Sequence, residues 1–215
     1  MYNSNMATFG RYLIPARTHR VEEEIKKSRF ITTAAHTPTV DDARAFIDTM
    51  RQEFADASHN CWAYVIGAPG STDRIGMSDD GEPHGTAGQP MMRTLSFAEV
   101  GDICVVVTRY FGGTLLGKGG LVKAYSGGVQ LALAELPTAE RIPSAELDIV
   151  VDYPVLTPIQ RILSEYEAYI LNEEFAAEIT LRIKMPIEQV NGFRQTITDM
   201  TNGDALIEVI SSDEM

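Results

Sequence analysis

Residues 104–136 read CVVVTRYFGGTLLGKGGLVKAYSGGVQLALAEL, and this stretch decides the fold of the first part of the chain. β-Branched residues fill Asp102–Tyr110 and predict a buried strand. Gly119–Leu136 has the pattern of a long helix, which Gly127-Gly128 either kinks or packs closely against a neighbour. The glycine-rich turn Arg109–Gly120 joins the strand directly to the helix, so the sequence predicts a mixed α/β domain.

The sequence before this stretch predicts further strands and helices. Thr39 is placed to cap a helix that carries two aspartates in its first turn. A composition rich in Gly, Ser and Asp predicts a loop over Gly67–Glu82, and Pro137–Ser144 (PTAERIPS) is predicted to be a linker. The expected elements are strands over Arg17–Lys27, Phe30–Ala35 and Cys61–Ile66 and helices over Val40–Phe54 and Gly88–Val100.

The last third of the chain has the order β-α-β-β-α-β, which is the ferredoxin-like pattern. Apolar and polar residues alternate in its first strand, and apolar residues at helical spacing mark both helices. The expected elements are strands over Ala145–Tyr153, Ala168–Leu171, Ala176–Lys184 and Ala205–Ser211, a turn at Asn172–Glu174, and helices over Pro154–Glu167 and Ile187–Thr201. The predicted domains are therefore 1–138 and 143–215.

The chain has 215 residues and a formal net charge of −12. Residues 143–215 carry 4 basic and 14 acidic residues, so most of the negative charge lies in the second domain. That domain repels phosphate backbones at long range, so any contact with nucleic acid is expected in the first domain. No apolar run approaches a membrane span, and no secretory signal is expected in the first residues. Cys61 and Cys104 are expected to be buried free thiols in the cytoplasm.

The glycine stretch is close to a phosphate-binding loop. Read from Gly112 to Gly119 it is G-G-T-L-L-G-K-G, one residue short of G-x-x-x-x-G-K-[ST]. Gly119 stands where the loop needs a hydroxyl to hold magnesium, which argues against nucleotide hydrolysis. Two interpretations stay open: glycines that allow close packing with Arg109 or Lys118 paired locally, and a pocket for an anion or a phosphate backbone.

Two further segments carry candidate chemistry. SDDGEPHGTAG (78–88) places three carboxylates next to His84. They would suit a divalent cation, or they would belong to a rigid polar loop whose acids cap the next helix or pair with arginines. In HNCWAY (59–64), His59 and Cys61 share one face of a strand, as a nucleophilic pair or as a strand-entry histidine beside a buried thiol. Lys26–Phe30 adds a basic cluster with an aromatic ring, typical of phosphate contact and base stacking or of a solvated strand end.

Together these segments closely resemble the YigZ/IMPACT family of translation-linked proteins. KKSRFI, HNCWAY, SDDGEPHGTAGQP and RYFGGTLLGKGGLVKAYS occur in the family's order and spacing over residues 26–126. The resemblance implies a two-layer α/β first domain of the ribosomal-protein-like type, with a left-handed βαβ unit, and a ferredoxin-like second domain similar to one of elongation factor G. It also implies a role in translation: the eukaryotic branch regulates a kinase pathway through a protein partner, and the bacterial branch is proposed to bind nucleic acid or ribosomes.

The resemblance carries the family's motif positions onto this chain. They are Arg29, His59, Cys61, Asp79, Asp80, Gly81, Glu82, Pro83, Gly85, Thr86, Gly88, Pro90, Arg109, Tyr110, Phe111, Gly112, Gly113, Gly117, Gly119, Gly120 and Tyr125. Two residues depart from the family pattern: His84 stands where a small residue is usual, and Lys123 where arginine is common. Lysine in place of arginine would weaken a bidentate phosphate contact.

The chain is therefore interpreted as a translation-associated regulatory or binding protein rather than an enzyme. It is expected to contact RNA, the ribosome or a translation factor through its first domain, and a protein partner through its acidic second domain. No cofactor, metal or membrane contact is expected. The expected binding residues are Lys27, Arg29, His59, Asp79, Asp80, Glu82, Thr86, Arg109, Tyr110, Phe111, Gly112, Gly113, Gly117, Lys118, Gly119, Gly120, Lys123 and Tyr125.

Two alternatives to a binding protein remain. One is a small hydrolase-type enzyme that uses the loop of Asp79, Asp80 and Glu82 with a divalent metal or with His59 or His84. The other is a scaffold whose glycines serve packing alone.

Overall fold

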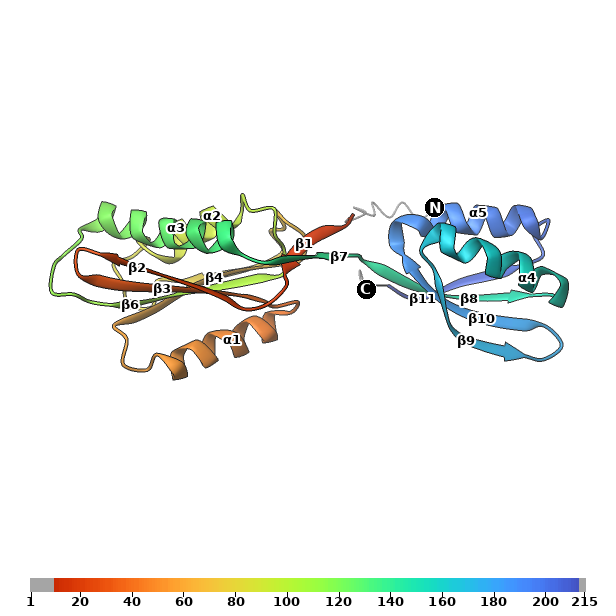
Figure 1. Cartoon of the computed structure of the whole chain (residues 1–215), viewed down its shortest axis with the longest axis horizontal. Helices are drawn as coiled ribbons and strands as arrows, with labels where there is room; N and C mark the ends of the chain where they lie inside the picture. The colour runs from red at the N-terminus through yellow and green to blue at the C-terminus, as the bar shows by residue number, and fades with distance from the viewer. Residues whose placement is uncertain (1–9, 213–215) are drawn as a thin grey trace. The chain divides into compact units, whose positions relative to one another are not determined.

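The computed structural model describes residues 10–212, and its contacts divide them into two units (Figure 1). The front unit spans Tyr12–Arg141. The back unit contains residues 10–11 and 142–212. Each unit has its own hydrophobic core, so each is described by itself.

The front unit is built on a five-stranded antiparallel sheet with the strand order β2-β3-β6-β4-β5. Strand β6 lies at its centre and is buried along almost its whole length, as the run of β-branched residues predicts. The strands are β2 (His19–Ile25), β3 (Ser28–His36), β4 (His59–Ile66), β5 (Arg74–Ser78) and β6 (Ile103–Tyr110). Strand β5 lies inside the segment Gly67–Glu82, so the expectation of a continuous loop there is wrong.

Helices cover both faces of this sheet (Figure 1). Helices α2 (Gly88–Leu95) and α3 (Lys118–Glu135) pack on one face, and α1 (Val40–Glu53) packs on the other. The predicted α/β class of the front unit is confirmed, and α1 adds a layer on the second face. The side chain of Thr39 accepts a hydrogen bond from the backbone N–H of Asp42, as expected of the cap of α1.

A two-stranded ribbon of β1 (Tyr12–Pro15) and β7 (Thr138–Arg141) joins the two ends of the front unit's chain. The expected linker Pro137–Ser144 contains the boundary between the two units, after Arg141, but its residues Thr138–Arg141 form a strand. Buried Asp102 fixes this ribbon: its carboxylate accepts hydrogen bonds from the Tyr12 hydroxyl (2.8 Å) and the Arg141 guanidinium (2.6 Å).

The back unit has the βαββαβ order and the strand order β11-β8-β10-β9, which confirms the ferredoxin-like prediction. Its helices share one core with the sheet. The elements are β8 (Ser144–Val151), α4 (Tyr153–Ile162), the 3₁₀ helix η1 (Leu163–Tyr166), β9 (Tyr169–Phe175), β10 (Ile179–Pro186), the 3₁₀ helix η2 (Ile187–Gln189), α5 (Val190–Met200) and β11 (Leu206–Ser212).

One turn of the back unit lies elsewhere than expected. Residues 172–174 continue strand β9, so the predicted turn at Asn172–Glu174 is wrong. The chain reverses after Phe175, where the N–H of Ala176 donates to the carbonyl of Glu178 (3.0 Å). None of the helices within residues 10–212 has the length and apolar character needed to cross a membrane.

Candidate functional site

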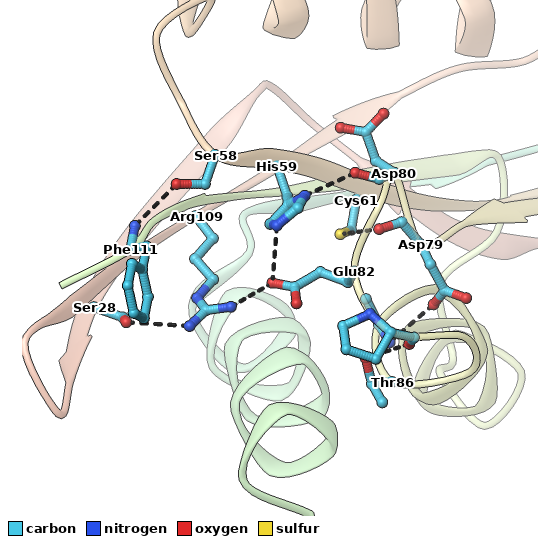
Figure 2. Close-up of polar contacts among 12 residues, drawn as sticks. Ser28, Ser58, His59, Cys61, Asp79, Asp80, Glu82, Thr86, Arg109 and Phe111 are labelled. Carbon is cyan, nitrogen blue, oxygen red and sulfur yellow. Dashed lines mark hydrogen bonds and ion pairs between the residues drawn. The ribbon is translucent and has the colours of Figure 1, made fainter. Parts of the chain in front are cut away.

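The candidate site lies at one end of the front sheet, where β3 and β4 begin and β6 ends. Arg109 on β6 pairs with Phe30 on β3 and with His59 on β4. The acid loop after β5, the glycine-rich loop after β6 and the start of α3 adjoin the same end, because Ser78 pairs with Trp62 near the start of β4. Figure 2 shows how this topology gathers side chains that are far apart in the sequence.

At the centre of the site, Glu82 and Arg109 form a buried ion pair. Arg109 Nη1 lies 2.6 Å from Glu82 Oε1, and the two residues are 5% and 7% exposed (Figure 2). The buried hydroxyl of Tyr125, on α3, donates to the same oxygen at 2.8 Å. The site therefore ties the acid loop, the central strand and α3 together at one carboxylate.

The guanidinium of Arg109 is held on its other sides as well. Its Nη2 donates to Ser28 Oγ at 3.3 Å, and its carbon lies 5.5 Å from the ring centroids of Phe30 and Phe111. Its Nε has no hydrogen-bond partner among the described residues. Two aromatic faces suit a guanidinium of this kind. Because Arg109 is enclosed, its geometry suits organising the loop at Phe111 rather than touching a large ligand.

His59 lies beside Glu82 and is partly exposed. Its Nδ1 donates to the carbonyl oxygen of Asp80 at 2.8 Å, and its Nε2 lies 3.9 Å from Glu82 Oε1 (Figure 2). The side chain is 25% exposed. A backbone carbonyl only accepts, so this contact places a proton on Nδ1 and leaves Nε2 free to accept one in the neutral ring.

Asp79 and Asp80 satisfy the backbone of their own loop and its neighbours. Asp79 accepts from the N–H groups of Gly85 (2.8 Å), Ala87 (3.0 Å) and Gly88 (2.8 Å) at the start of α2. Burial alone would raise the pKa of Asp79, but these three hydrogen bonds outweigh it and hold the pKa below its ordinary value. Asp80 accepts from the N–H of Asn60 at 2.7 Å.

The acid loop thus has the geometry of a capping loop paired with arginines, one of the two interpretations open from the sequence. Asp80 pairs with Arg51 on α1 (3.1 Å), as Glu82 does with Arg109. Thr86 closes the loop by donating to the carbonyl of Pro83 at 2.6 Å. Within residues 10–212, no group of three His, Cys, Asp or Glu side chains is arranged to hold a metal ion.

Cys61 lies beside the cluster but lacks the properties of a nucleophile. Its thiol is buried and donates to the carbonyl of Asp79 at 3.0 Å. Burial raises the pKa of Cys61 far above that of an ordinary thiol, so the reactive thiolate is suppressed. Cys104 is buried and its pKa is raised for the same reason.

The glycine-rich loop lies directly against the β2–β3 turn. A Cβ atom on Gly112 would lie 1.8 Å from the carbonyl oxygen of Lys27, so only glycine fits there. The Gly112 N–H donates to Ser28 Oγ at 3.3 Å. Gly113 and Gly117 adopt φ angles of 82° and 73°, a region that favours glycine. These three glycines are required by the fold of the loop itself.

The lysines of the site have no partners, in contrast to its arginines. Lys26 and Lys27 form the β2–β3 turn with φ angles of 48° and 67°, and their side chains are exposed, as are those of Lys118 and Lys123 on α3. In the described part of the chain, none of the four makes a side-chain hydrogen bond or ion pair. Arg29, by contrast, pairs with Glu22 through two hydrogen bonds of 2.5 and 2.8 Å.

The structure places the expected site residues in three groups. His59, Asp79, Asp80, Glu82, Thr86, Arg109 and Tyr125 surround the buried ion pair. Lys27, Lys118 and residues 111–120 form the adjoining loop surface, and Lys123 follows along α3. Arg29 and Tyr110 lie on the sheet, where the Tyr110 hydroxyl donates to Asp56 (2.7 Å) and its ring faces the Arg29 guanidinium.

Sequence reasoning missed two serines that shape the loop. Ser28 accepts from both Arg109 and Gly112, and Ser58 Oγ accepts from the Phe111 N–H at 3.1 Å (Figure 2). Ser28 adjoins the basic cluster KKSRF, but nothing in that cluster indicates a contact 84 positions away. Only the strand order brings these residues together.

Comparison with known proteins finds a matching family domain in each of the two units. Residues 26–133 match the family model of the Impact N-terminal domain, and residues 149–204 match a domain of unknown function, DUF1949. The chain is 47% identical over 192 residues to the IMPACT family member YigZ of Escherichia coli, covering 89% of this chain and 94% of that protein. It is 35% identical over 184 residues to the IMPACT family member YvyE of Bacillus subtilis, covering 86% and 84%. A solved structure described as that of a hypothetical protein is 45% identical with a TM-score of 0.69, covering 94% of this chain and 98% of that one.

Proposed function

This chain belongs to the IMPACT family, a family associated with the regulation of translation, and we propose that its front unit binds the phosphate backbone of RNA, including RNA at the ribosome surface. The contact surface consists of Lys26, Lys27 and Lys118 beside the loop Phe111–Gly117. Lys123 extends it along α3. The back unit, with its excess of acidic residues, stays away from the RNA.

One observation carries this proposal: exposed lysines without partners among the described residues lie on the turn and the loop at one end of the sheet, in a chain of net charge −12. These exposed ammonium groups keep their full charge and are not neutralised by a neighbouring carboxylate among the described residues, so they are available to a phosphate. Each phosphate that they neutralise releases a counterion, which makes the binding depend on salt. The exposed ring of Phe111 adds a surface on which a base can stack.

In this proposal Arg109 and Glu82 organise the site rather than touch RNA. Their ion pair fixes the end of β6, and Arg109 supports the ring of Phe111 from below. Ser58 and Ser28 hold the backbone of Phe111 and Gly112. The loop therefore approaches a ligand in a fixed conformation, which reduces the ordering cost of binding.

The test is the affinity for a fluorescein-labelled single-stranded RNA of about 12 nucleotides, measured by anisotropy at rising salt concentration. With three lysines on phosphates, the slope of log affinity against log salt should be about −2. Lys118→Glu should lower the affinity about tenfold and make the slope shallower by about 0.7. Co-sedimentation with ribosomes should fall in the same variant.

Arg74→Glu is the matched control. Arg74 is exposed and pairs with Ile66, at the opposite end of β4 from His59, so this variant makes the same charge change far from the site. It should leave both the affinity and the slope nearly unchanged. An equal loss of affinity in the two variants would mean that RNA binding depends only on the net charge of the protein. The absence of RNA binding at low salt would reject the proposal.

A small hydrolase is the second candidate, and the geometry of His59 favours it. The ring is oriented by the carbonyl of Asp80 and is 25% exposed, and its Nε2, 3.9 Å from Glu82, is free to accept a proton, as a general base requires. The test is a thermal-shift series with Mg²⁺, Mn²⁺, Zn²⁺ and nucleotides. A ligand at about 100 times its Kd adds roughly 2.7 kcal/mol to the stability, and the absence of any shift at such excess would remove this candidate.

We propose that the back unit contacts a protein rather than RNA. We also propose that the whole chain is located in the cytoplasm. Strand β8 alternates buried Leu147 and Ile149 with Glu146 and Asp148 on the opposite face of the sheet. Its neighbour β11 adds Glu208 opposite Asp148. The same face also carries Arg182, which pairs with Asp148 at 2.7 Å, and Lys184 opposite Glu146. The proposal therefore rests on the acidic excess of the back unit as a whole, which suits a basic protein surface. RNA binding that persisted after charge reversal of the lysine surface would contradict this division of roles.

A further inference from the structure

A groove of about 710 Å³ runs between α2 and α3 on the helical layer of the front unit. Arg93, Thr94 and Phe97 line it from the α2 side, and Val122, Ser126 and Leu133 line it from α3. Arg93 and Thr94 belong to the last turn of α2 and Phe97 follows that helix, while Val122, Ser126 and Leu133 lie along one face of α3. The groove thus lies between the two helices, and its lining contains none of the four site lysines.

The lining of this groove is unusually apolar for a solvent-facing surface. Phe97 is 82% exposed at its edge, and Val122 is 37% exposed on the facing helix. Leu133 is partly buried and forms part of the floor against the core. Exposed apolar side chains that gather in one concave surface mark an interaction site more often than the same side chains scattered singly.

One basic side chain lies beside this apolar lining. Arg93 is the charged residue among those that line the groove, while Glu99 and Glu135 directly follow the lining residues Ala98 and Ala134. In the part of the chain that the structure describes, Arg93 makes no side-chain hydrogen bond or ion pair. The groove therefore offers the guanidinium of Arg93 beside an apolar floor.

We propose that this groove binds an amphipathic helix of a partner protein that carries acidic residues beside its apolar stripe. Apolar residues at i, i+4 and i+7 of such a helix would pack against Phe97, Val122 and Leu133, and a flanking carboxylate would pair with Arg93. The hydroxyls of Thr94 and Ser126 already donate to the carbonyls of Pro90 and Val122. Arg93 and Gln130 are the lining side chains left to donate, which fits a helix better than RNA. A second copy docked about a two-fold axis would bring a second Arg93 against this one.

The test uses a fluorescein-labelled helical peptide of about 15 residues, with leucines in one stripe and glutamates on both flanks. Its twin has every glutamate replaced by lysine. Binding to the full chain is measured by anisotropy. The acidic peptide should bind at least about tenfold more tightly than its twin. Phe97→Ser and Arg93→Glu should each weaken the acidic peptide about tenfold.

Leu115→Ser is the matched control. Leu115 is 83% exposed, like Phe97, but lies in the glycine-rich loop, so this variant should bind the peptide as the unaltered chain does. Because Phe97 and Arg93 are both exposed, their variants should keep the thermal midpoint of the unaltered chain.

Four results would overturn the proposal: equal binding of the two peptides, no binding up to about 1 mM, no effect of Phe97→Ser, or displacement of the peptide by labelled RNA. A dimer seen by sedimentation that Phe97→Ser abolishes would make a second copy the occupant instead. Loss of RNA binding in Lys118→Glu with peptide binding by the groove retained would show that the two surfaces act independently.

Discussion

Glu82 and Arg109 lie 27 positions apart in the sequence and meet as a buried ion pair of 2.6 Å. The acid loop and the glycine-rich loop are therefore parts of one cluster. Tyr125 donates to the same carboxylate, so the contact also fixes α3. A buried charge is tolerated only where such partners surround it.

Removing one partner of this pair should be strongly destabilising. Arg109→Leu leaves the Glu82 carboxylate buried without its cation, and the expected loss is about 3–5 kcal/mol of unfolding free energy. Urea denaturation of the variant measures it. The matched control is Arg29→Ala, which breaks the exposed pair with Glu22 and should cost about 0–1 kcal/mol. Similar losses in the two variants would mean that burial of the inner pair does not govern its energy.

Alanine in place of Gly112 should lower the stability of the protein, and alanine in place of Gly119 should raise it. Gly112→Ala places a Cβ atom 1.8 Å from the Lys27 carbonyl oxygen, so the loop or the β2–β3 turn must move and stability must fall. Gly119 lies in the first turn of α3 with nothing within 4 Å of its Cβ position. Gly119→Ala should therefore stabilise the protein by about 0.5–1 kcal/mol. Thermal denaturation of both variants decides the matter, and a stabilising Gly112→Ala would contradict the close contact.

The fold of the back unit follows from local patterns, and the ribbon of the front unit does not. Alternation in β8 and helical spacing in α5 are visible in short windows of sequence. Strand β7 has four polar or small residues beside prolines, which looks like a linker, and it is a strand only because β1 pairs with it from the other end of the unit. Pairings between distant segments leave no periodic signal in either one.

In the candidate site too, some contacts follow from local sequence and others depend on the pairing of distant strands. The capping role of Asp79 follows from an acidic loop placed just before a helix. The meeting of Ser28, Gly112 and Arg109 depends on β3 lying beside β6 in the sheet, and sequence spacing does not reveal strand order. The turn expected at Asn172–Glu174 failed because polar residues on an edge strand resemble a turn.

Asp79 should make the stability fall in acid. Its pKa in the folded chain lies below the unfolded value of about 4, so its contribution is complete above that value and is lost as the pH falls through the folded pKa. Asp79→Asn should flatten the dependence of unfolding free energy on pH below about 5. Asp73→Asn is the control, since Asp73 is exposed and makes no hydrogen bond or ion pair among the described residues. Equal curves for the two variants would show that the hydrogen bonds at the start of α2 do not depend on charge.

Replacing both lysines of the turn Lys26-Lys27 should raise the stability of the chain and lower its affinity for RNA. Both lysines adopt positive φ angles in a two-residue hairpin turn, a conformation that asparagine and glycine adopt at much lower cost. Lys26→Asn with Lys27→Gly should therefore raise the unfolding free energy by about 1 kcal/mol in urea, while it removes two of the proposed phosphate contacts. RNA affinity should fall at least about tenfold, with a shallower salt slope. A variant that is more stable and binds RNA as before would show that the strained lysines serve neither the fold nor the proposed ligand. A more stable variant that no longer binds would mean that the chain keeps a costly turn for the charges that it presents.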